Sequence, residues 1–298
     1  MDDLSKFKYF DIKDIKLEDE IDHSNLIVYK GVLNGKDIAI KEYNTDKEGL
    51  DDTIINELNI GTKVSSERLL EIYGYSHNSD KTKYYLLMEY INQGSVYQYI
   101  NQDKYYKSTD HDKTISDYTL KQGCCTWNYI MSDKLKFSLI ISILKAIKSM
   151  YDNNIIHGDI KPCNLVIHKS NDNLFIKVID YGTCIISRDN IDIDYVVGTD
   201  GYYAPEQEEN SILDHKSDIY SIGVSIIEIW NGSIWKKNKG KFNETRNDVL
   251  KGLRNIKKNN IELEKLLKKC IDLNYKKRPD IYKLYDEFIK LSQPQNQM

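Results

Sequence analysis

Short runs of apolar or alternating residues, separated by polar turns, occupy the N-terminal part of the chain and are typical of β-strands. Five such runs predict strands, at residues 15–21, 26–33, 36–43, 69–74 and 84–90. Asn34-Gly35 joins the second and third runs and is the strongest short hairpin signal, because both positions tolerate a positive φ. A polar turn at 78–83 joins the last two runs. The pattern predicts a five-stranded sheet whose first three strands are antiparallel.

Apolar residues with helical spacing dominate the remainder of the chain. Residues 52–63 predict a helix between the third and fourth strands. Residues 133–153 predict a buried helix, with apolar side chains at positions 135, 139, 140, 143, 144, 147 and 150. A strongly apolar helix is predicted over 218–230, and a last helix follows 277–279. The order of elements favours an α+β fold, a small β part followed by a larger helical part.

Composition narrows the class of protein. The chain has 298 residues, 40% hydrophobic and 30% charged, enough for one large or two small lobes around a substantial core. A net charge of −4 gives no broad positive surface, so we expect no nucleic-acid partner. The most apolar run, 137–150, is interrupted by Lys145 and Lys148, so no membrane partner is expected.

Cysteine usage bears on metals and on compartment. The chain has five cysteines, scattered and odd in number, and no CxxC pair, which argues against structural zinc. The absence of a secretory leader favours free thiols in a reducing compartment, so we expect a cytoplasmic protein. We also expect a monomer.

Candidate chemistry is concentrated between His157 and Gly182. Asp159 is followed by Lys161 and Asn164, and two strand-like runs, at 165–168 and 174–179, then lead to Asp180. Two acids and an amide on tight turns suit phosphate and metal chemistry, since Mg²⁺ takes oxygen ligands and shares them with nucleotide phosphates. The third of these groups can orient a hydroxyl nucleophile.

This stretch resembles the catalytic and metal loops of the protein kinase superfamily, H-R-D-x-x-x-x-N and D-F-G, with Gly158 in place of Arg and Tyr181 in place of Phe. Small-molecule kinases related to choline and aminoglycoside phosphotransferases also carry an HGD…N…D series. Three later features favour the protein kinases: Ala204-Pro205-Glu206, which matches A-P-E, the segment that starts at Asp218, and Arg278 as a partner for Glu206. The small-molecule enzymes are not expected to have all three.

The resemblance implies a bilobal protein kinase fold. We expect one domain over residues 10–292, with a small, mostly antiparallel β lobe at about 10–91 and a larger, mainly helical lobe at 92–292. Residues 103–131 are polar and read as an insertion between two helices of the larger lobe. The sequence assigns this insertion no role.

For the phosphates, the resemblance implies that Lys41, in the strand that matches V-A-I-K, points into the cleft and holds the α- and β-phosphates of ATP. Glu57 is expected to pair with this lysine. Asp51 and Asp52 compete for that role but fall at the helix start, where acids act as caps. An ordinary solvated lysine is the alternative reading of Lys41.

For the reaction, the resemblance implies that Asp159 accepts or orients the substrate hydroxyl proton and that Lys161 neutralises the moving phosphoryl group. Asn164 and Asp180 are expected to hold Mg²⁺. His157 is read as a scaffold that supports the loop.

For the adenine, the segment YYLLMEYINQG resembles the hinge of the family. Met88 is expected at the gatekeeper position, and the backbone from Glu89 to Ile91 is expected to bond the adenine edge. The purine pocket is expected to be lined by Val28, Ala39 and Val166. Each apolar residue is equally compatible with ordinary core packing.

Two departures from the family pattern matter. The three glycine positions of the phosphate loop fall near Ile21, His23 and Leu26, and no glycine precedes Gly31, so we expect weaker ATP binding or a different pose. Gly158 removes the arginine that pairs with a phosphorylated activation segment, and only Arg188 offers a replacement. We therefore expect any activity to be independent of phosphorylation at Ser187, Tyr195 and Thr199.

Three functions remain open. The first is a serine/threonine protein kinase that uses ATP and Mg²⁺, favoured by the D-x-K-x-x-N pattern at Asp159 and by Thr199 before A-P-E. The second is a pseudokinase that binds another kinase or its substrate, for example as a viral decoy in the host cytoplasm. It is favoured by the glycine-free loop and by the segments IAIKEY, LLEIYGY and LLMEYINQGS. These segments resemble the tyrosine-kinase-like branch, which includes mixed lineage kinase domain-like pseudokinases. The third is a small-molecule phosphotransferase.

Overall fold

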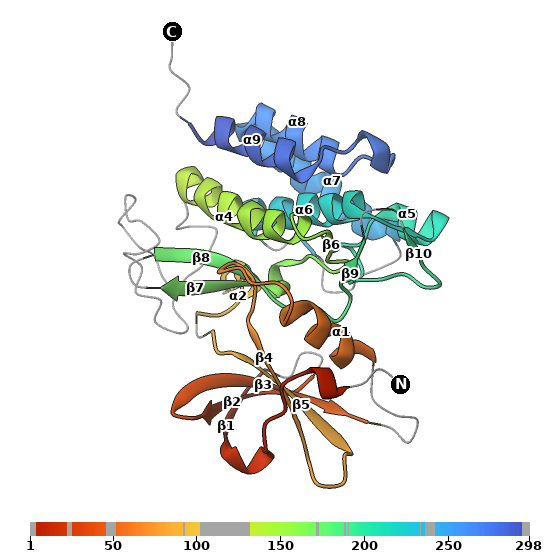
Figure 1. Ribbon diagram of the computed structural model, residues 1–298. Helices are drawn as coiled ribbons and strands as arrows, with labels where there is room; N and C mark the ends of the chain where they lie inside the picture. The colour runs from red at the N-terminus through yellow and green to blue at the C-terminus, as the bar shows by residue number, and fades with distance from the viewer. Residues whose placement is uncertain are drawn as a thin grey trace. The chain divides into compact units, whose positions relative to one another are not determined.

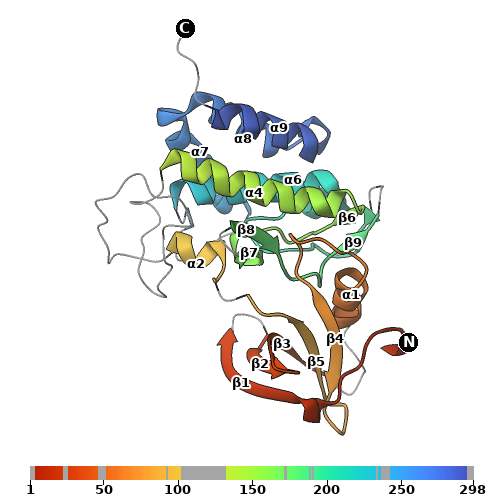
Figure 2. The same ribbon diagram turned by 60° about the vertical axis from the view of Figure 1, so that its left-hand side comes forward.

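The computed structural model divides into two compact units, one formed by Met1–Asn92 with Ile179–Cys184 and the other by Gln93–Val178 with Ile185–Met298. It describes residues 4–22, 26–45, 52–91, 93–101, 132–170, 173–187, 189, 191–232, 234–235 and 242–293. The predicted insertion at 103–131 lies outside these residues. We call the two parts unit 1 and unit 2; Figures 1 and 2 show their elements in two views.

Unit 1 is built on a five-stranded antiparallel sheet with the order β1-β2-β3-β5-β4. Its strands are β1 (Ile15–Asp22), β2 (Val28–Leu33), β3 (Lys36–Asn44), β4 (Ile72–His77) and β5 (Lys83–Glu89), and its helix is α1 (Asp52–Gly61). Asn34 and Gly35 have φ values of 52° and 77°, which confirms the predicted hairpin between β2 and β3. Short 3-10 turns at Leu4–Lys6 and Ile12–Asp14 precede the sheet.

One predicted strand is displaced. The sequence predicts a strand at 69–74, whereas β4 starts at Ile72 and runs to His77. Pairing with β5 explains the shift, because Tyr75, Ser76 and His77 lie opposite Leu86, Tyr85 and Tyr84. Backbone pairing thus extends the strand through residues whose polarity had suggested its end.

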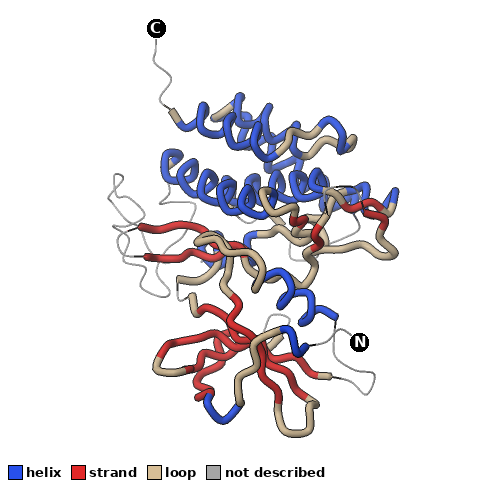
Figure 3. The backbone as a smooth tube through the Cα atoms, viewed as in Figure 1, coloured by secondary structure: helices blue, strands red, loops and turns tan. Residues whose placement is uncertain are grey.

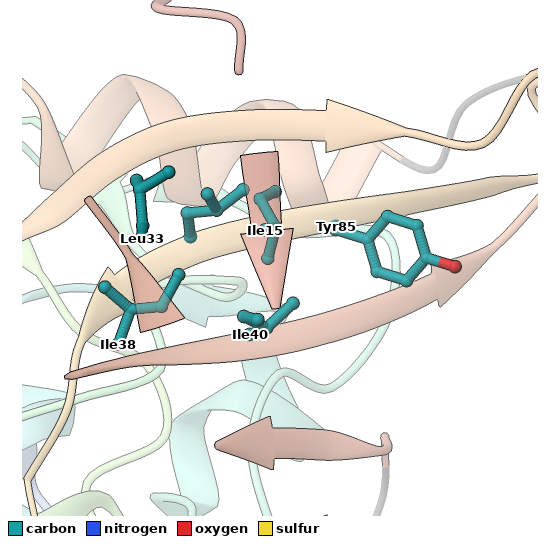
Figure 4. Packing of buried hydrophobic residues seen from close by; sticks show 6 residues of the cluster. Ile15, Leu33, Ile38, Ile40 and Tyr85 are labelled. Carbon is teal, nitrogen blue, oxygen red and sulfur yellow. The ribbon is translucent and has the colours of Figure 1, made fainter. Parts of the chain in front are cut away.

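The two faces of the unit 1 sheet carry different side chains. Figure 4 shows a cluster of buried residues on one face, made by Ile15, Leu33, Ile38, Ile40, Tyr85 and Leu87. Successive side chains of a strand point to opposite faces, so Lys41 and Tyr43 on β3 share the face opposite to Ile38 and Ile40. The hydrophobic pattern of β3 therefore fixes which face carries the candidate chemistry.

Unit 2 is mainly helical (Figure 3). Its helices are α2 (Val96–Asn101), α4 (Asp133–Tyr151), α5 (Pro205–Asn210), α6 (His215–Asn231), α7 (Phe242–Asn259), α8 (Ile261–Cys270) and α9 (Ile281–Ser292), with 3-10 turns at Pro162–Asn164 and Tyr275–Lys277. Its strands pair in twos: β6 (Ile155–Ile156) with β9 (Ile185–Ile186), β7 (Leu165–Ser170) with β8 (Asn173–Val178), and β10 (Ile191–Asp192) with β11 (Ile212–Leu213). These findings confirm the predicted α+β class. None of the helices that the structure describes is long and apolar enough to span a bilayer.

Helix α6 is the buried centre of unit 2. All its residues from Ser217 to Trp230 are buried. The helix starts at His215, three residues before the predicted start, because the Asp214 side chain forms a capping box with Ser217. The early start places the carboxylate of Asp218 inside the first turn of a buried helix.

Candidate active site

A buried ion pair joins β3 and α1 in unit 1. The Lys41 Nζ lies 2.6 Å from Glu57 Oε1 and 2.9 Å from Asp180 Oδ1. Asp180 belongs to the segment after β8 and is 139 residues away from Lys41 in the chain. Folding thus brings together three of the predicted site residues, one cation between two carboxylates.

Burial and charge act in opposite directions on this pair. The Glu57 side chain is only 1% exposed, and its burial raises its pKa, while the positive charge of Lys41 works against that rise. Burial alone lowers the pKa of Lys41, but the charges of Glu57 and Asp180 outweigh it and hold this pKa well above the ordinary value. Lys41 is therefore a fixed positive charge over the whole physiological pH range.

Tyr43 is a member of this cluster that the sequence interpretation missed. Its hydroxyl donates a hydrogen bond to Glu57 Oε1. Burial raises the pKa of Tyr43, and the neighbouring charge of Glu57 raises it further. The signal was present in the sequence, because Tyr43 follows Lys41 by two positions and a strand places such residues on the same face.

The segment at 179–184 is fixed by α1. The Asn56 Nδ2 donates to the carbonyl oxygens of Tyr181, Gly182 and Cys184 at 3.1, 3.0 and 2.7 Å. Asp180 itself has a φ of 67°, a left-handed conformation that aspartate adopts more readily than most residues. The turn that presents the Asp180 carboxylate is therefore held by side-chain bonds from a helix of the same unit.

The residues predicted to surround a nucleotide base are divided between the units. In unit 1, Val28 lies opposite Lys41 in the pairing of β2 with β3, and Ala39 lies opposite Met88 in the pairing of β3 with β5. Two further predicted residues, Glu89 and Ile91, lie at and just after the end of β5. Val166 is on β7 and belongs to unit 2. Their common role stays a prediction.

Of the three predicted glycine-loop positions, Ile21 is the penultimate residue of β1 and is 44% exposed, and Leu26 is half-buried. His23 and Arg188 lie outside the described residues.

The turn after β6 in unit 2 holds the Asp159 carboxylate by one oxygen. Lys161 Nζ donates to Asp159 Oδ2 at 2.6 Å, and Asn164 Nδ2 donates to the same oxygen at 3.3 Å and to the Asp159 carbonyl at 2.9 Å. The second oxygen, Oδ1, is buried and has no hydrogen-bond partner among the described residues. A buried carboxylate oxygen without a donor is costly, so this atom is available to accept a proton or a hydrogen bond from a hydroxyl group.

Lys161 has a second partner in the segment before A-P-E. Its Nζ donates to Thr199 Oγ1 at 2.6 Å, in addition to its bond with Asp159. The ammonium group therefore connects the turn after β6 to the segment before A-P-E, and the hydroxyl oxygen of Thr199 accepts a hydrogen bond.

Asp218 holds the backbone of the turn after β6. Its two carboxylate oxygens accept the backbone N–H groups of His157 and Gly158 at 2.7 and 2.9 Å, and His157 Nδ1 accepts the N–H of Asp159 at 3.2 Å. Burial raises the pKa of Asp218, which these donors and the neighbouring His157 oppose. Gly158 has a φ of 79°, which favours glycine at this position.

A second ion pair braces the end of the activation segment. Arg278 donates to both oxygens of Glu206, at 2.6 and 2.7 Å, and both side chains are buried. Ser217 Oγ also donates to Glu206 Oε1. The partnership that the sequence predicted across 72 residues is confirmed.

The residues predicted to hold Mg²⁺ have suitable donor atoms. The Nδ2 of Asn164 is used by Asp159, and its Oδ1 accepts no hydrogen bond from any residue that the structure describes. The Asp180 carboxylate is one-third exposed. Amide and carboxylate oxygens are hard donors of the kind that Mg²⁺ prefers. Asn164 belongs to unit 2 and Asp180 to unit 1, so their joint ligation of one ion stays a prediction.

Comparison with known proteins gives one family. Residues 24–288 match the family described as "Protein kinase domain". The chain is 30% identical over 233 residues to a receptor-like serine/threonine-protein kinase of Arabidopsis thaliana, covering 76% of this chain and 24% of that protein. It is 31% identical over 194 residues to an Aurora kinase of Saccharomyces cerevisiae, covering 65% of this chain and 43% of that protein. A putative mitogen-activated protein kinase kinase kinase 7-like protein of Drosophila melanogaster is 24% identical over 286 residues, which cover 92% of this chain and 65% of the relative. The matched part of the chain thus spans about a quarter of the length of the first relative and less than half of the second.

Proposed function

Because this chain belongs to the protein kinase superfamily, we propose that it transfers the γ-phosphoryl group of ATP to serine or threonine hydroxyls of a protein substrate. The proposal includes the single kinase domain at residues 10–292 and the site residues predicted from the sequence. It also includes Mg²⁺ as the metal.

The state of Asp159 carries the proposal. One carboxylate oxygen is held by Lys161 and Asn164, and the other is buried without a partner among the described residues. A carboxylate held in this way can accept the proton of an incoming hydroxyl without having to reorient. A purely structural aspartate of the same burial is expected to have both oxygens bonded.

The partners of Lys161 support phosphoryl transfer at Asp159. The ammonium group contacts Asp159 and Thr199 together, so a positive charge is fixed beside the general base. Phosphoryl transfer depends on positioning and on compensation of charge, and a fixed lysine supplies both.

For the nucleotide, the proposal assigns Lys41 to the phosphates and Asn164 with Asp180 to the metal. Bound Mg²⁺ supplies neutralisation of phosphate charge. Lys41 is held between Glu57 and Asp180, so its ammonium group is oriented before a nucleotide binds. Preorganised charge of this kind needs no rearrangement during the reaction.

The test is the variant Asp159→Asn. It retains the shape of the side chain and removes the base, so we expect turnover on a generic serine/threonine substrate to fall by about 10²–10⁴-fold. The matched control is Asp192→Asn, an exposed aspartate of β10, which we expect to leave turnover and melting temperature unchanged. Equal activity of Asp159→Asn and the wild type contradicts the proposal.

One observation favours a second candidate, a kinase-fold binding module without catalysis. No glycine precedes Gly31, so the segment that covers the phosphates in the family lacks the residues that let its backbone approach them. Thermal shift with ATP and Mg²⁺ separates the two candidates, since a ligand that binds the folded state raises the melting temperature. No shift, together with no Asp159-dependent turnover, favours the binding module.

A further inference from the structure

The hydroxyl of Tyr43 and the ammonium of Lys41 use the same oxygen of Glu57. Lys41 Nζ lies 2.6 Å from Glu57 Oε1, and the Tyr43 hydroxyl donates to that atom too. Tyr43 is 1% exposed, so neither its ring nor its hydroxyl has an alternative position in water. One carboxylate oxygen is therefore fixed from two directions by side chains of one strand.

We infer that Tyr43 is a positioning residue of the phosphate-binding lysine, whose hydroxyl fixes the Glu57 carboxylate so that Lys41 is held in one place. The inference rests on the proposed function for its consequence, the binding of a nucleotide phosphate. The bond between Tyr43 and Glu57 can be tested without a nucleotide.

The ring and the hydroxyl of Tyr43 have separable effects. Lys41 Nζ lies 5.5 Å from the centroid of the Tyr43 ring, within the range of a cation–π contact. Phenylalanine retains the ring and its packing and removes only the hydroxyl. Tyr43→Phe therefore removes the contacts of the hydroxyl with Glu57 and with Lys41 and retains the ring.

Four ionisable groups act on or respond to Glu57 in unit 1. Lys41 and Tyr43 approach it from β3, and Asp180 and Tyr181 belong to the segment after β8. Burial raises the pKa of Glu57, Asp180 adds to the rise, and Lys41 and the Tyr43 hydrogen bond oppose it. Removal of the Tyr43 hydroxyl thus raises the pKa of Glu57 further, and the loss of stability grows as pH rises through that pKa.

The first experiment uses the nucleotide-free chain. The melting temperatures of the wild type and of Tyr43→Phe are compared at neutral and at mildly acidic pH. We expect the deficit of Tyr43→Phe to be larger at neutral than at mildly acidic pH, because the lost hydrogen bond favours the ionised form of Glu57. The matched control is Tyr85→Phe, which removes a hydroxyl from another buried tyrosine of the same sheet and is expected to show no such change with pH. A deficit that does not depend on pH, or that is the same for both variants, overturns the inference.

The second experiment measures kcat/KM for ATP as a function of pH. Because a hydrogen bond to a charged group is removed, we expect Tyr43→Phe to lower kcat/KM by about tenfold and to move its acidic limb to higher pH. Tyr85→Phe should retain both values of the wild type. If the wild type has no activity, the proposed function fails, and the pH dependence of melting still decides the role of Tyr43. An active Tyr43→Phe with an unchanged pH profile overturns the inference while leaving the proposed function intact.

Discussion

The two units each contain a buried ion pair, and the pairs differ in how completely their partners are enclosed. In unit 2, Arg278 is 0% and Glu206 2% exposed, and the guanidinium meets the carboxylate through two parallel bonds. In unit 1, Glu57 is 1% exposed, but Lys41 is 13% and its second partner Asp180 34% exposed. Both members of the first pair are fully buried, whereas in the second Lys41 is slightly exposed and its partner Asp180 is one-third exposed.

The difference in exposure indicates that the Arg278 pair stabilises the fold, whereas the Lys41 cluster can bind a ligand. Arg278 also donates to the carbonyl oxygens of Lys216 and Asp272, so four acceptors depend on it. Lys41 is shared between two carboxylates, and a cation with a partly exposed partner can exchange that partner for a phosphate oxygen. Closure favours a structural role, and partial exposure favours binding.

The largest expected effect comes from Arg278→Ala. It removes one member of a buried pair, leaves Ser217 as the remaining side-chain donor to Glu206, and takes the Arg278 donors away from two carbonyl oxygens. We expect a loss of about 3–5 kcal/mol in the free energy of unfolding, measured by chemical denaturation. Arg254→Ala, at an exposed position of α7, is the control and should have little effect. If Arg278→Ala loses no more unfolding free energy than Arg254→Ala, the distinction between the two ion pairs is wrong.

Lys41→Ala should cost less stability and more function. Glu57 retains the Tyr43 hydrogen bond and can take up a proton, so we expect a loss of about 1–3 kcal/mol in the free energy of unfolding. The thermal shift with ATP and Mg²⁺ should disappear. Lys13→Ala, an exposed lysine of the same unit, should retain both properties. Retention of the thermal shift by Lys41→Ala would argue against its role as the phosphate lysine.

The stability of Lys41→Ala should also depend on pH, which gives a second test of the unit 1 ion pair. Burial raises the pKa of Glu57, and loss of the lysine raises it more. For a carboxyl whose folded-state pKa is raised, the linked stability is fully present below the unfolded pKa and is lost as pH rises through the folded pKa. The variant should therefore be less destabilised at mildly acidic than at neutral pH. Parallel melting curves of variant and wild type across this range would contradict the assignment.

The smallest effect is expected in the activation segment. Ser187→Ala and Tyr195→Phe should change turnover by less than about twofold, because Gly158 supplies no arginine to pair with a phosphate there. Tyr195 is 77% exposed, so its substitution also leaves packing unchanged. Thr199 is not a suitable probe of phosphorylation, since its hydroxyl already accepts from Lys161. Loss of turnover in either variant would contradict the expected independence of phosphorylation.

Local patterns in the sequence carried most of the fold. The Asn34-Gly35 turn, the alternation along β3 and the apolar spacing of α4 each depend on residues close together in the chain, and each element formed where it was expected. The start of β4 was wrong by three residues because its partner β5, and not its own polarity, determines its extent.

The candidate site was predictable only where its residues follow a family pattern. The pairing of Lys41 with Glu57 follows from such a pattern, and so does the position of Arg278. The bonds of Tyr43 to Glu57 and of Lys161 to Thr199 do not, because they depend on the depth and rotation at which each side chain is buried. The orphan oxygen of Asp159 likewise became visible only once its other partners had been placed.

The three bonds from Asn56 have a mechanical consequence. One amide on α1 holds the carbonyls at 181, 182 and 184, and the next residue on the helix, Glu57, holds Lys41. Two adjacent residues of α1 therefore contact the segment at 179–184 and Lys41. A rotation of α1 about its axis would displace both that segment and the lysine. A ligand bound to α1 alone would thus alter the positions of Lys41 and Asp180 without contacting either residue.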